Sequence, residues 1–368
     1  MLERHVRWGG NTSFKKTHRV AFVKEFGKPF VIEEVPTPEP KDREVLIKVL
    51  GAGICHTDVH IWKGDWAAGG LPPKLPFVVS HEIVGEVVAK GEKVPDSVKI
   101  GQKVIVYAWG WSQDDDWVIR GLGHLTDHQI HLGVTAEGGL REYFLIPDYR
   151  FAVEAEGLED FPTAAPLACA GLTTYRATRR LLPYLAPDDY VAVVGLGGLG
   201  AYAVSWLRSL APYVNVVGID VKDEAIDFVN KIAKLDAAVN PQKGDPVKEL
   251  MGVTKGKGLK AVIDLVATDK TIGVYTNALS KTGVYMLVGM MGVMATIGPL
   301  VPFIATEKAI LSSVVGTLQE QKEVVVAARR GMVNYRAIVT RKLKLEEASE
   351  AIEALEKGRV LGRQVVVF

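Results

Sequence analysis

The sequence predicts an α/β protein in which a doubly wound parallel sheet is inserted into a mostly antiparallel, barrel-like domain. Three observations support this fold class. The first part of the 368-residue chain has short β-rich runs broken by Pro and Gly. The second part alternates apolar strands with helical stretches. The last apolar run, Gln364–Phe368, has no helix after it, so we expect it to return to the first domain.

The outer, barrel-like domain is expected to come from both ends of the chain. We predict an N-terminal extension over 1–18, outer-domain segments over 19–168 and 317–368, and the doubly wound domain over 169–316. The predicted strands of the first segment are Arg19–Val23, Val45–Leu50, Val78–Ser80, Ile83–Val88, Val104–Tyr107 and Leu140–Ile146. Residues 110–133 show no periodicity and are expected to form a surface lobe.

The doubly wound domain follows a predicted helix that runs from Thr163 through Cys169 to Leu182. Six apolar runs are its candidate strands: Val191–Val194, Val214–Ile219, Ala237–Val239, Ala261–Asp264, Val284–Val288 and Ile310–Val315. Helical stretches separate the first five, which is the pattern of a parallel sheet with helices on both faces. The tail adds a predicted helix over Glu346–Leu355.

Composition limits the partners of the chain. An apolar content of 48% with 24% charged residues is typical of a globular protein. The formal net charge of +1 creates no field that would attract nucleic acid or an anionic membrane. No apolar run approaches the roughly 20 residues of a membrane span, and the basic N-terminal segment lacks the apolar core of a secretory signal. Two cysteines are too few for a disulfide framework, so we expect a reducing, cytoplasmic location.

One glycine-rich turn dominates the second half of the sequence. Val191–Val194 predicts a buried strand and Ala201–Leu210 a packed helix, and the residues between them fit the pattern GxGxxG: Gly195, Gly197, Gly198, Leu199 and Gly200. The first glycine would allow a tight turn, the second would let a pyrophosphate approach the backbone, and the last would let helix and strand pack closely. The phosphates would then lie at the helix N-terminus.

An acidic residue stands where a dinucleotide site requires one. Asp220 ends the next apolar run, about twenty residues past the last glycine, where a carboxylate binds the adenosine ribose hydroxyls. The same carboxylate would repel a 2′-phosphate, so NAD(H) is favoured. Lys222 could counter that charge and allow NADP(H).

The two cysteines have two interpretations. Taken singly, Cys55 and Cys169 could be buried, unreactive thiols. Together with His81, they form a donor set of two thiolates and one imidazole, which suits zinc and leaves one coordination position open, as a catalytic site requires. The wide separation of these residues in the sequence makes spacing alone a weak argument.

Several motifs in the chain resemble those of the zinc-dependent alcohol dehydrogenases of the medium-chain dehydrogenase/reductase family. They run in family order from about residue 18 to the end: Gly53-Ile-Cys-His-Thr-Asp-Val-His60, His81-Glu82, Gly138-Gly-Leu-Arg-Glu-Tyr143, Leu167-Ala-Cys-Ala-Gly-Leu-Thr-Thr174, Gly195 to Gly200, and Gly362-Arg-Gln-Val365. The resemblance implies a Rossmann domain inserted in a GroES-like catalytic domain.

The resemblance also implies roles for single residues. Cys55, His81 and Cys169 would bind one catalytic zinc ion, with Glu82 as a carboxylate that can exchange onto the metal and Asp58 orienting an imidazole ligand. Thr57 would pass the alcohol proton towards His60 by way of the ribose. Thr173 would contact the nicotinamide and Arg363 the pyrophosphate, while His56 either reaches the cofactor phosphates or only packs.

The function implied is reversible hydride transfer between a small-molecule alcohol, ketone or aldehyde and NAD(H) or NADP(H), in a homodimer or homotetramer. Two alternatives belong to other classes: a nicotinamide-binding redox sensor without turnover, and a zinc-free reductase of the quinone reductase type. The first predicts loss of the relay or of a ligand, and the second predicts loss of both cysteines. The sequence retains all of these residues.

The chain departs from the family pattern in two places. Many relatives carry a structural zinc on four lobe cysteines, and this lobe has none; Asp116 and His124 keep only the last interval and are a poor substitute for thiolates. We therefore expect one zinc per chain. Ser80 replaces the glycine that usually precedes the His-Glu pair, and its side chain could crowd the bend or shift His81.

The aromatic residues bear on the substrate. Five of the seven tryptophans fall in one span: Trp62, Trp66, Trp109, Trp111 and Trp117. They either line a substrate channel, which would favour bulky or cyclic apolar alcohols, or pack the lobe in place of the missing metal. The remaining histidines, His5, His18, His124, His128 and His131, are expected at the surface.

Overall fold

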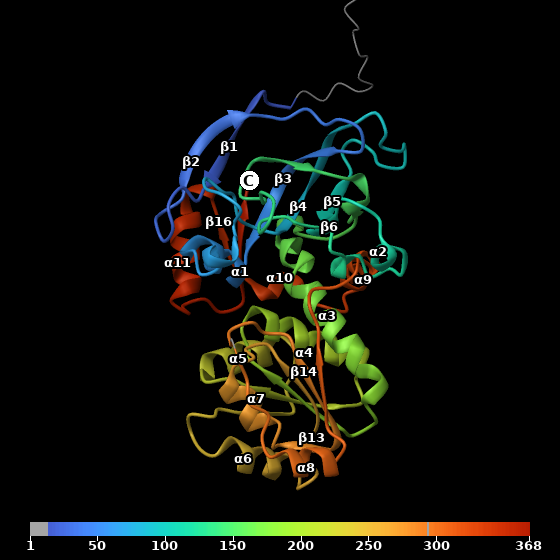
Figure 1. Ribbon diagram of the computed structural model, residues 1–368, viewed down its shortest axis with the longest axis vertical. Coiled ribbons are helices and arrows are strands. Elements are labelled where there is room, and N and C mark those ends of the chain that lie inside the picture. Colours follow the sequence, from blue (N-terminus) through green and yellow to red (C-terminus); the bar gives the residue numbers. More distant parts are fainter. Residues whose placement is uncertain (1–13, 293) are drawn as a thin grey trace, which may run out of the picture.

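The structure, a computed structural model, describes residues 14–292 and 294–368. Figure 1 shows two parts stacked along the long axis of the molecule, one built from both ends of the chain and the other from its middle. Residues 1–13 of the predicted extension, His5 among them, lie outside the described residues, and Thr17 and His18 already belong to the first strand.

The middle of the chain forms a six-stranded parallel sheet in the order β12-β11-β10-β13-β14-β15. Counted from β10, this is the order 3-2-1-4-5-6 of a doubly wound dinucleotide-binding fold, so the predicted fold is confirmed. All six predicted strands are present: β10 (Tyr190–Val194), β11 (Asn215–Ile219), β12 (Ala237–Val239), β13 (Leu259–Asp264), β14 (Leu279–Leu287) and β15 (Ala309–Ser312).

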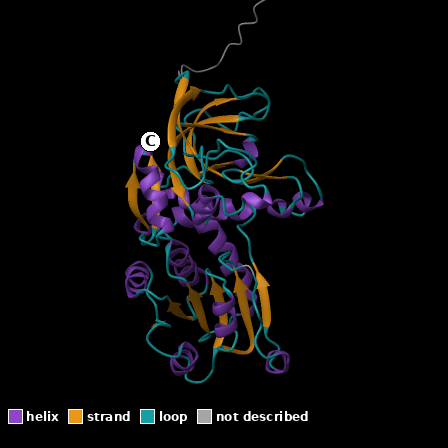
Figure 2. Ribbon diagram, turned by 60° about the vertical axis from the view of Figure 1, so that its left-hand side comes forward, coloured by secondary structure: helices purple, strands orange, loops and turns teal. Residues whose placement is uncertain are grey.

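Helices lie around this sheet (Figure 2), which explains the continuous apolar runs of its central strands. They are α4 (Gly198–Leu210), α5 (Asp223–Ile232), α6 (Pro246–Val253), α7 (Asp269–Tyr275) and α8 (Leu300–Ala305). Residues 191–194 of β10 are all buried because the strand lies between two covered faces.

The outer part contains a seven-stranded sheet in the order β16-β17-β3-β4-β5-β9, with β8 also paired to β3. The last strand pairs antiparallel with β3, with Val366 opposite Ala52, and this confirms that the chain returns to the first domain. The bounds are β3 (Val45–Ile54), β4 (Glu82–Lys90), β5 (Lys103–Val106), β8 (Tyr143–Ile146), β9 (Ala152–Glu154), β16 (Val339–Leu343) and β17 (Arg363–Val367). Two small sheets add β1 (Thr17–Phe22) with β2 (Val31–Pro36), and β6 (Trp109–Trp111) with β7 (Gln129–His131).

The remaining helices belong to the outer part or to its junction with the parallel sheet. They are α1 (His56–Lys63), α2 (Asp116–Ile119), α3 (Ala170–Leu181), α9 (Leu318–Arg329), α10 (Tyr335–Ile338) and α11 (Ala348–Glu356), with 3-10 turns η1 (Ala67–Gly69), η2 (Gly123–Leu125), η3 (Tyr149–Phe151), η4 (Phe161–Ala168), η5 (Leu182–Tyr184) and η6 (Leu345–Glu347). Helix α3 lies between the two parts of the molecule (Figure 1). It is joined to α4 by the Trp206 indole, whose Nε1 donates to the Gly171 carbonyl at 2.9 Å. Across the described residues, every helix is too short or too polar to cross a bilayer.

Two local predictions were wrong. Val78–Ser80 is not a strand, because Ser80 has a left-handed backbone (φ 79°) that an extended strand excludes. The single helix predicted from Thr163 to Leu182 is broken at Cys169, where η4 ends and α3 begins. The break matters because it turns the Cys169 side chain out of a regular helical position.

Candidate active site

Four side chains from three distant segments converge on one buried point. The sulfur atoms of Cys55 and Cys169, a ring nitrogen of His81 and a carboxylate oxygen of Glu82 all lie within 4.8 Å of one another. All four side chains are buried. The three residues predicted as metal ligands are therefore adjacent, together with the predicted nearby carboxylate.

The local backbone explains how each ligand reaches this point. Cys55 follows β3 and is the N-cap of α1, so its side chain stands at a strand-to-helix corner. His81 lies just before β4, after the left-handed Ser80. The Ser80 hydroxyl donates to the Gly53 carbonyl at 2.8 Å, so the side chain that we expected to crowd the bend instead ties it to the end of β3.

Unpaired polar atoms in this group indicate that it can bind a zinc ion. Both ring nitrogens of His81 and Oε2 of Glu82 are buried without a hydrogen-bond partner among the described residues. A buried unpaired polar group costs about 1–3 kcal/mol, so such a cluster calls for a ligand. Two sulfur donors and one imidazole suit zinc, and the carboxylate adds a fourth donor.

The pKa of Cys55 favours a bound cation, whereas the pKa values of Cys169 and Glu82 are raised. A hydrogen bond from the Cys169 thiol holds the pKa of Cys55 well below its ordinary value; burial opposes this, and the positive charges of His81 and Arg363 reinforce it. Burial raises the pKa of Glu82, although Arg363 acts in the opposite direction. A thiolate at Cys55 is the form in which cysteine binds metal.

Asp58 supports the two segments that carry Cys55 and His81. Its fully buried carboxylate accepts the backbone N–H of Cys55 at 2.7 Å and of Ser80 at 2.9 Å. Its Oδ1 also lies 3.5 Å from Nδ1 of His81. One carboxylate thus fixes the backbone beside two predicted ligands and faces the ring of the second.

Arg363 links the buried group to the glycine turn. Its guanidinium forms an ion pair with Oε1 of Glu82, and both side chains are buried. A Cβ added at Gly198 would lie 2.2 Å from Cδ of Arg363, so the arginine stem packs directly on the turn. A Cβ at Gly53 would in turn lie 2.1 Å from Oε2 of Glu82, which leaves room only for glycine there.

The glycine turn has the geometry that a dinucleotide site needs. Gly195 has φ 89°, a backbone that glycine adopts without strain. Gly197 is the N-cap of α4, and a Cβ added there would have no atom within 4 Å, so its backbone faces open space. A Cβ at Gly200 would lie 2.3 Å from the Gly195 carbonyl oxygen, which explains the close contact of helix and strand. Leu199, in the first turn of α4, is half-buried.

Asp220 lies beside this turn. Its Oδ2 accepts the Leu196 N–H at 2.7 Å and its Oδ1 accepts the Lys222 N–H at 2.9 Å, so the carboxylate is fixed at the end of β11. The Lys222 ammonium group donates to the Gly358 carbonyl at 2.6 Å. Thr173 lies on the first turns of α3, where its N–H donates to the Cys169 carbonyl at 2.8 Å.

The predicted relay residues lie on α1. Thr57 is in its first turn and half-buried, and His60 is one turn further on. Nδ1 of His60 lies 2.8 Å from Oδ2 of Asp65, and the ring stacks on Trp66 with 4.9 Å between centroids. Sequence reasoning missed both contacts, although Gly64, a left-handed helix C-cap (φ 77°), was a signal that the chain turns back there.

Known proteins resemble the chain along most of its length. Residues 41–156 match the alcohol dehydrogenase GroES-like domain and residues 198–329 the zinc-binding dehydrogenase domain. An NAD-dependent alcohol dehydrogenase of Sulfurisphaera tokodaii is 36% identical, covering 93% of this chain and 98% of its own. A D-arabinose 1-dehydrogenase (NADP(+)) of Saccharolobus solfataricus is 34% identical, covering 95% and 97%. The crystal structure of an alcohol dehydrogenase of Aeropyrum pernix is 32% identical, with a TM-score of 0.86 over 95% of this chain and 100% of that one.

The chain belongs to the zinc-dependent alcohol dehydrogenases of the medium-chain dehydrogenase/reductase family. The predicted GroES-like and Rossmann-type fold is confirmed by the same comparisons. The protein is therefore an enzyme, and its activity is that of an alcohol dehydrogenase.

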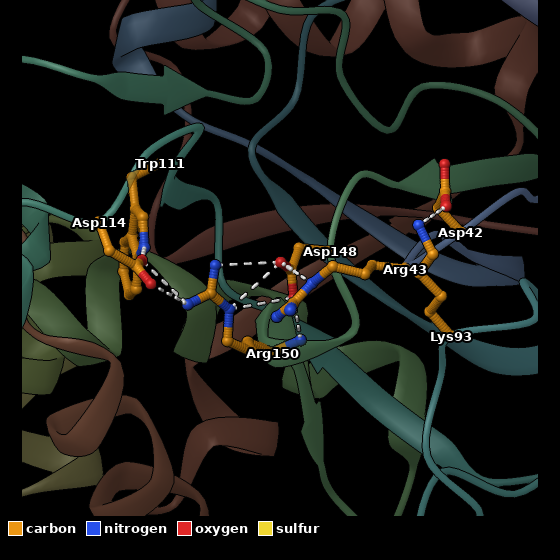
Figure 3. Close-up of polar contacts among 7 residues, drawn as sticks. All are labelled: Asp42, Arg43, Lys93, Trp111, Asp114, Asp148 and Arg150. Carbon is orange, nitrogen blue, oxygen red and sulfur yellow. Dashed lines mark hydrogen bonds and ion pairs between the residues drawn. The ribbon is translucent and has the colours of Figure 1, made fainter.

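In this dehydrogenase the lobe is held by ion pairs. Figure 3 shows Arg150 between two carboxylates: it donates to Asp114 at 3.0 Å and to Asp148 at 3.2 Å, and Asp148 also accepts from Arg43 at 2.8 Å. The Trp111 indole donates to Asp114 at 2.7 Å. These contacts join the lobe to the body of the catalytic domain.

The tryptophans of the dehydrogenase divide between the two predicted roles. Trp109 lies against His81, with 5.6 Å between ring centroids, and Trp66 stacks on His60, so both rings border site histidines. Trp111 packs in the lobe against Phe151, as the second alternative predicts. Trp62 donates to the Lys28 carbonyl in the core, and Trp117 is partly exposed.

The predicted surface position of the other histidines was wrong for His18 and His124, which are 1% and 2% exposed. His18 occupies an inward position of β1, and its ring packs against Tyr143. His124 lies in η2 beneath the lobe, and His128 and His131 are half-buried. His56, whose role was open, packs edge-on against His60 with 5.5 Å between centroids.

Proposed function

We propose that the protein transfers hydride reversibly between an alcohol and a nicotinamide cofactor, with one catalytic zinc ion per chain. The observation that carries this proposal is the buried group of two thiols, an imidazole and a carboxylate, joined by Arg363 to the glycine turn. A metal site beside a dinucleotide site is the arrangement that hydride transfer at a polarised carbonyl requires.

Cys55, His81 and Cys169 would bind the zinc ion, which supplies a Lewis acid that polarises the substrate oxygen. Asp58 keeps the Cys55 and Ser80 backbones in place and faces His81, so it would hold the imidazole in one orientation. Glu82, paired with Arg363, provides the carboxylate that can exchange onto the metal.

A proton must leave the alcohol as hydride leaves its carbon. The Thr57 hydroxyl can accept and donate a proton without carrying a charge, and the His60 imidazole can take up the proton and carry the charge. The Asp65 carboxylate at Nδ1 would stabilise the protonated ring. We therefore propose a relay from the alcohol through Thr57 and the ribose to His60 and solvent.

The cofactor would lie across the turn from Gly195 to Gly200, with its pyrophosphate at the N-terminus of α4 and next to Arg363. Thr173 would contact the nicotinamide, and His56 remains a candidate for phosphate contact. Asp220 would bind the adenosine ribose. The Lys222 ammonium donates to the Gly358 carbonyl and, among the described residues, forms no ion pair with Asp220, which supports NAD(H) over NADP(H).

We further propose that the substrate is a bulky or cyclic apolar alcohol or ketone, since the Trp66 and Trp109 rings border the site histidines.

The proposed domain limits are 19–168 and 317–368 for the catalytic domain and 169–316 for the dinucleotide domain. The limit at 316 falls between the end of β15 and the start of α9. The two free cysteines, both in the metal group, support a reducing, cytoplasmic location.

A homodimer or homotetramer is proposed from one exposed apolar surface. It is formed by Met290, Met291, Met294, Ile297, Leu300, Val301 and Ile304, and Val301 is 77% exposed. These residues precede β15, which is the edge strand of the parallel sheet among the described residues. A second copy of this chain would cover both the apolar surface and the open edge.

Metal analysis together with cysteine substitution tests the proposed function. The purified protein should contain about one zinc per chain. Cys55→Ser or Cys169→Ser should remove the bound zinc and the turnover of an alcohol panel, while binding of NADH, followed by its fluorescence, should stay within about twofold of the wild type. Full turnover in either variant would refute the metal assignment, and loss of NADH binding as well would indicate a general folding defect.

A further inference from the structure

A cavity lies between the lobe and the dinucleotide domain. It has a volume of about 270 Å³ and is bordered by η2 of the lobe, by α3, and by the residues that follow β14 and β15. Leu125 and Val288 are among its apolar walls, and its polar members are Arg176, Arg180, His124, Ser312 and Ser313. No carboxylate borders the cavity in the described part of the chain.

Arg180 gives this cavity a positive charge. Arg176 is neutralised by Glu320, with 2.8 Å between Nη1 and Oε2. Arg180, four residues later on the same face of α3, donates to the Ser312 carbonyl and has no carboxylate partner within residues 14–292 and 294–368. Glu320 thus compensates the charge of Arg176, whereas no carboxylate among the described residues compensates that of Arg180.

Two residues that border the cavity carry a buried polar atom without a partner. Nδ1 of His124 and Oγ of Ser313 have no hydrogen-bond partner among the described residues, although the two residues are only 2% and 6% exposed. Burial, reinforced by the charges of Arg176 and Arg180, lowers the pKa of His124 to about 4. At neutral pH the imidazole is therefore uncharged, and one of its nitrogens carries a hydrogen that can be donated.

We propose that this cavity binds a small oxyanion, a carboxylate or a phosphate group. The Arg180 guanidinium would supply a charge-assisted hydrogen bond, and the Ser313 hydroxyl and the His124 N–H would donate to the remaining oxygens. Each of these groups is a donor, and the absence of an acidic side chain in the described lining disfavours a cation. The apolar wall at Leu125 and Val288 would accommodate the carbon chain of a larger ligand.

Binding of inorganic phosphate tests the proposal directly. We expect calorimetric titration of the wild type to show binding, and the NMR signal of the His124 ring, assigned with His124→Gln, to shift on titration. Arg180→Met should weaken binding about tenfold or more, since it removes a charged hydrogen bond. Arg179→Met is the matched control, because Arg179 is adjacent but pairs with Glu323 outside the cavity. Ser313→Ala should weaken binding less.

Three results would overturn the proposal: no phosphate binding by the wild type, equal effects of the two arginine variants, or displacement of phosphate by saturating NADH, which would assign the anion to the cofactor site.

Kinetic measurements then show whether the anion is part of the substrate or a free ion. An alcohol that bears a terminal carboxylate should lose kcat/KM in Arg180→Met relative to its uncharged analogue if the substrate supplies the anion. Equal kcat/KM ratios with retained phosphate binding would support a site for a free anion. Neither binding measurement depends on turnover, so failure of the proposed function would not affect this test.

Discussion

Replacing Asp58 by asparagine removes one charge from the buried site and leaves the size of the side chain unchanged. The carboxylate accepts two backbone N–H groups, from Cys55 and Ser80, and faces Nδ1 of His81. An amide has a single acceptor oxygen, so its NH₂ group must face one of the two N–H donors. One buried donor is then left unpaired, at a cost of about 1–3 kcal/mol.

Loss of a residue that orients a metal ligand weakens metal binding about 10- to 100-fold. This corresponds to about 1.4–2.7 kcal/mol, the same range as the cost of the unpaired donor. We therefore expect the zinc Kd of Asp58→Asn, measured at pH 7 by competition with a chelator, to rise by one to two orders of magnitude. Turnover at saturating zinc should also fall, because the His81 ring is less well fixed.

Asp245→Asn is the matched control. The Asp245 carboxylate also accepts two backbone N–H groups, those of Val247 at 2.9 Å and Lys248 at 3.2 Å, but it does so at the start of α6, on the surface. Asn caps a helix about as well as Asp, and one oxygen, Oδ1, accepts both N–H groups, so this substitution should change the stability by only a few tenths of a kcal/mol and leave the zinc Kd unchanged. If the zinc Kd of Asp58→Asn stays within twofold of the wild type while both variants remain folded by circular dichroism, Asp58 does not orient the site.

Three further results are expected. Asp220→Gly should shift the ratio of kcat/KM values for NAD and NADP towards NADP, and an unchanged ratio would mean that another residue sets cofactor preference. Asp148→Asn should lower the free energy of unfolding in urea by about 1–2 kcal/mol near pH 7. Burial acts to raise the pKa of Asp148, but hydrogen bonds from Arg43 and Arg150 outweigh it and lower the pKa. The contribution of Asp148 to stability is therefore present above the ordinary carboxyl pKa and is lost as the pH falls through the lowered pKa. The difference in free energy of unfolding between Asp148→Asn and the wild type should vanish at that low pH. Val301→Asp should reduce the oligomer mass seen by light scattering, whereas Ile119→Asp, at an equally exposed lobe position, should not.

The sequence was sufficient for features that depend on local chemistry. The glycine turn was predictable because φ 89° at Gly195 and the close contact at Gly200 exclude other residues. The four central strands of the parallel sheet were predictable because both of their faces are covered, which requires continuous apolar runs. By contrast, β2 was missed because most of its residues are exposed or half-buried, so it has no regular apolar face.

The site was only partly predictable. The three sulfur and nitrogen donors were identified through the family resemblance, whereas the break at Cys169 depends on how η4 and α3 pack and has no local sequence signal. The burial of His124 was missed for a similar reason: the lobe covers it, and a polar residue in an aperiodic segment otherwise indicates exposure.

The contact between Glu82 and Arg363 joins the buried metal group to the glycine turn. These residues are 281 positions apart in sequence, and each would be a buried, unpaired charge without the other. The arginine stem fills the space beside Gly198 that a side chain would otherwise occupy. Because β17 carries Arg363 and pairs with β3, which leads into Cys55, the return of the C-terminal strand places the glycine turn and the first predicted ligand at one junction. A change in the conformation of Glu82 would therefore alter the position of Arg363 against the turn, and this physical link couples the two halves of the active site.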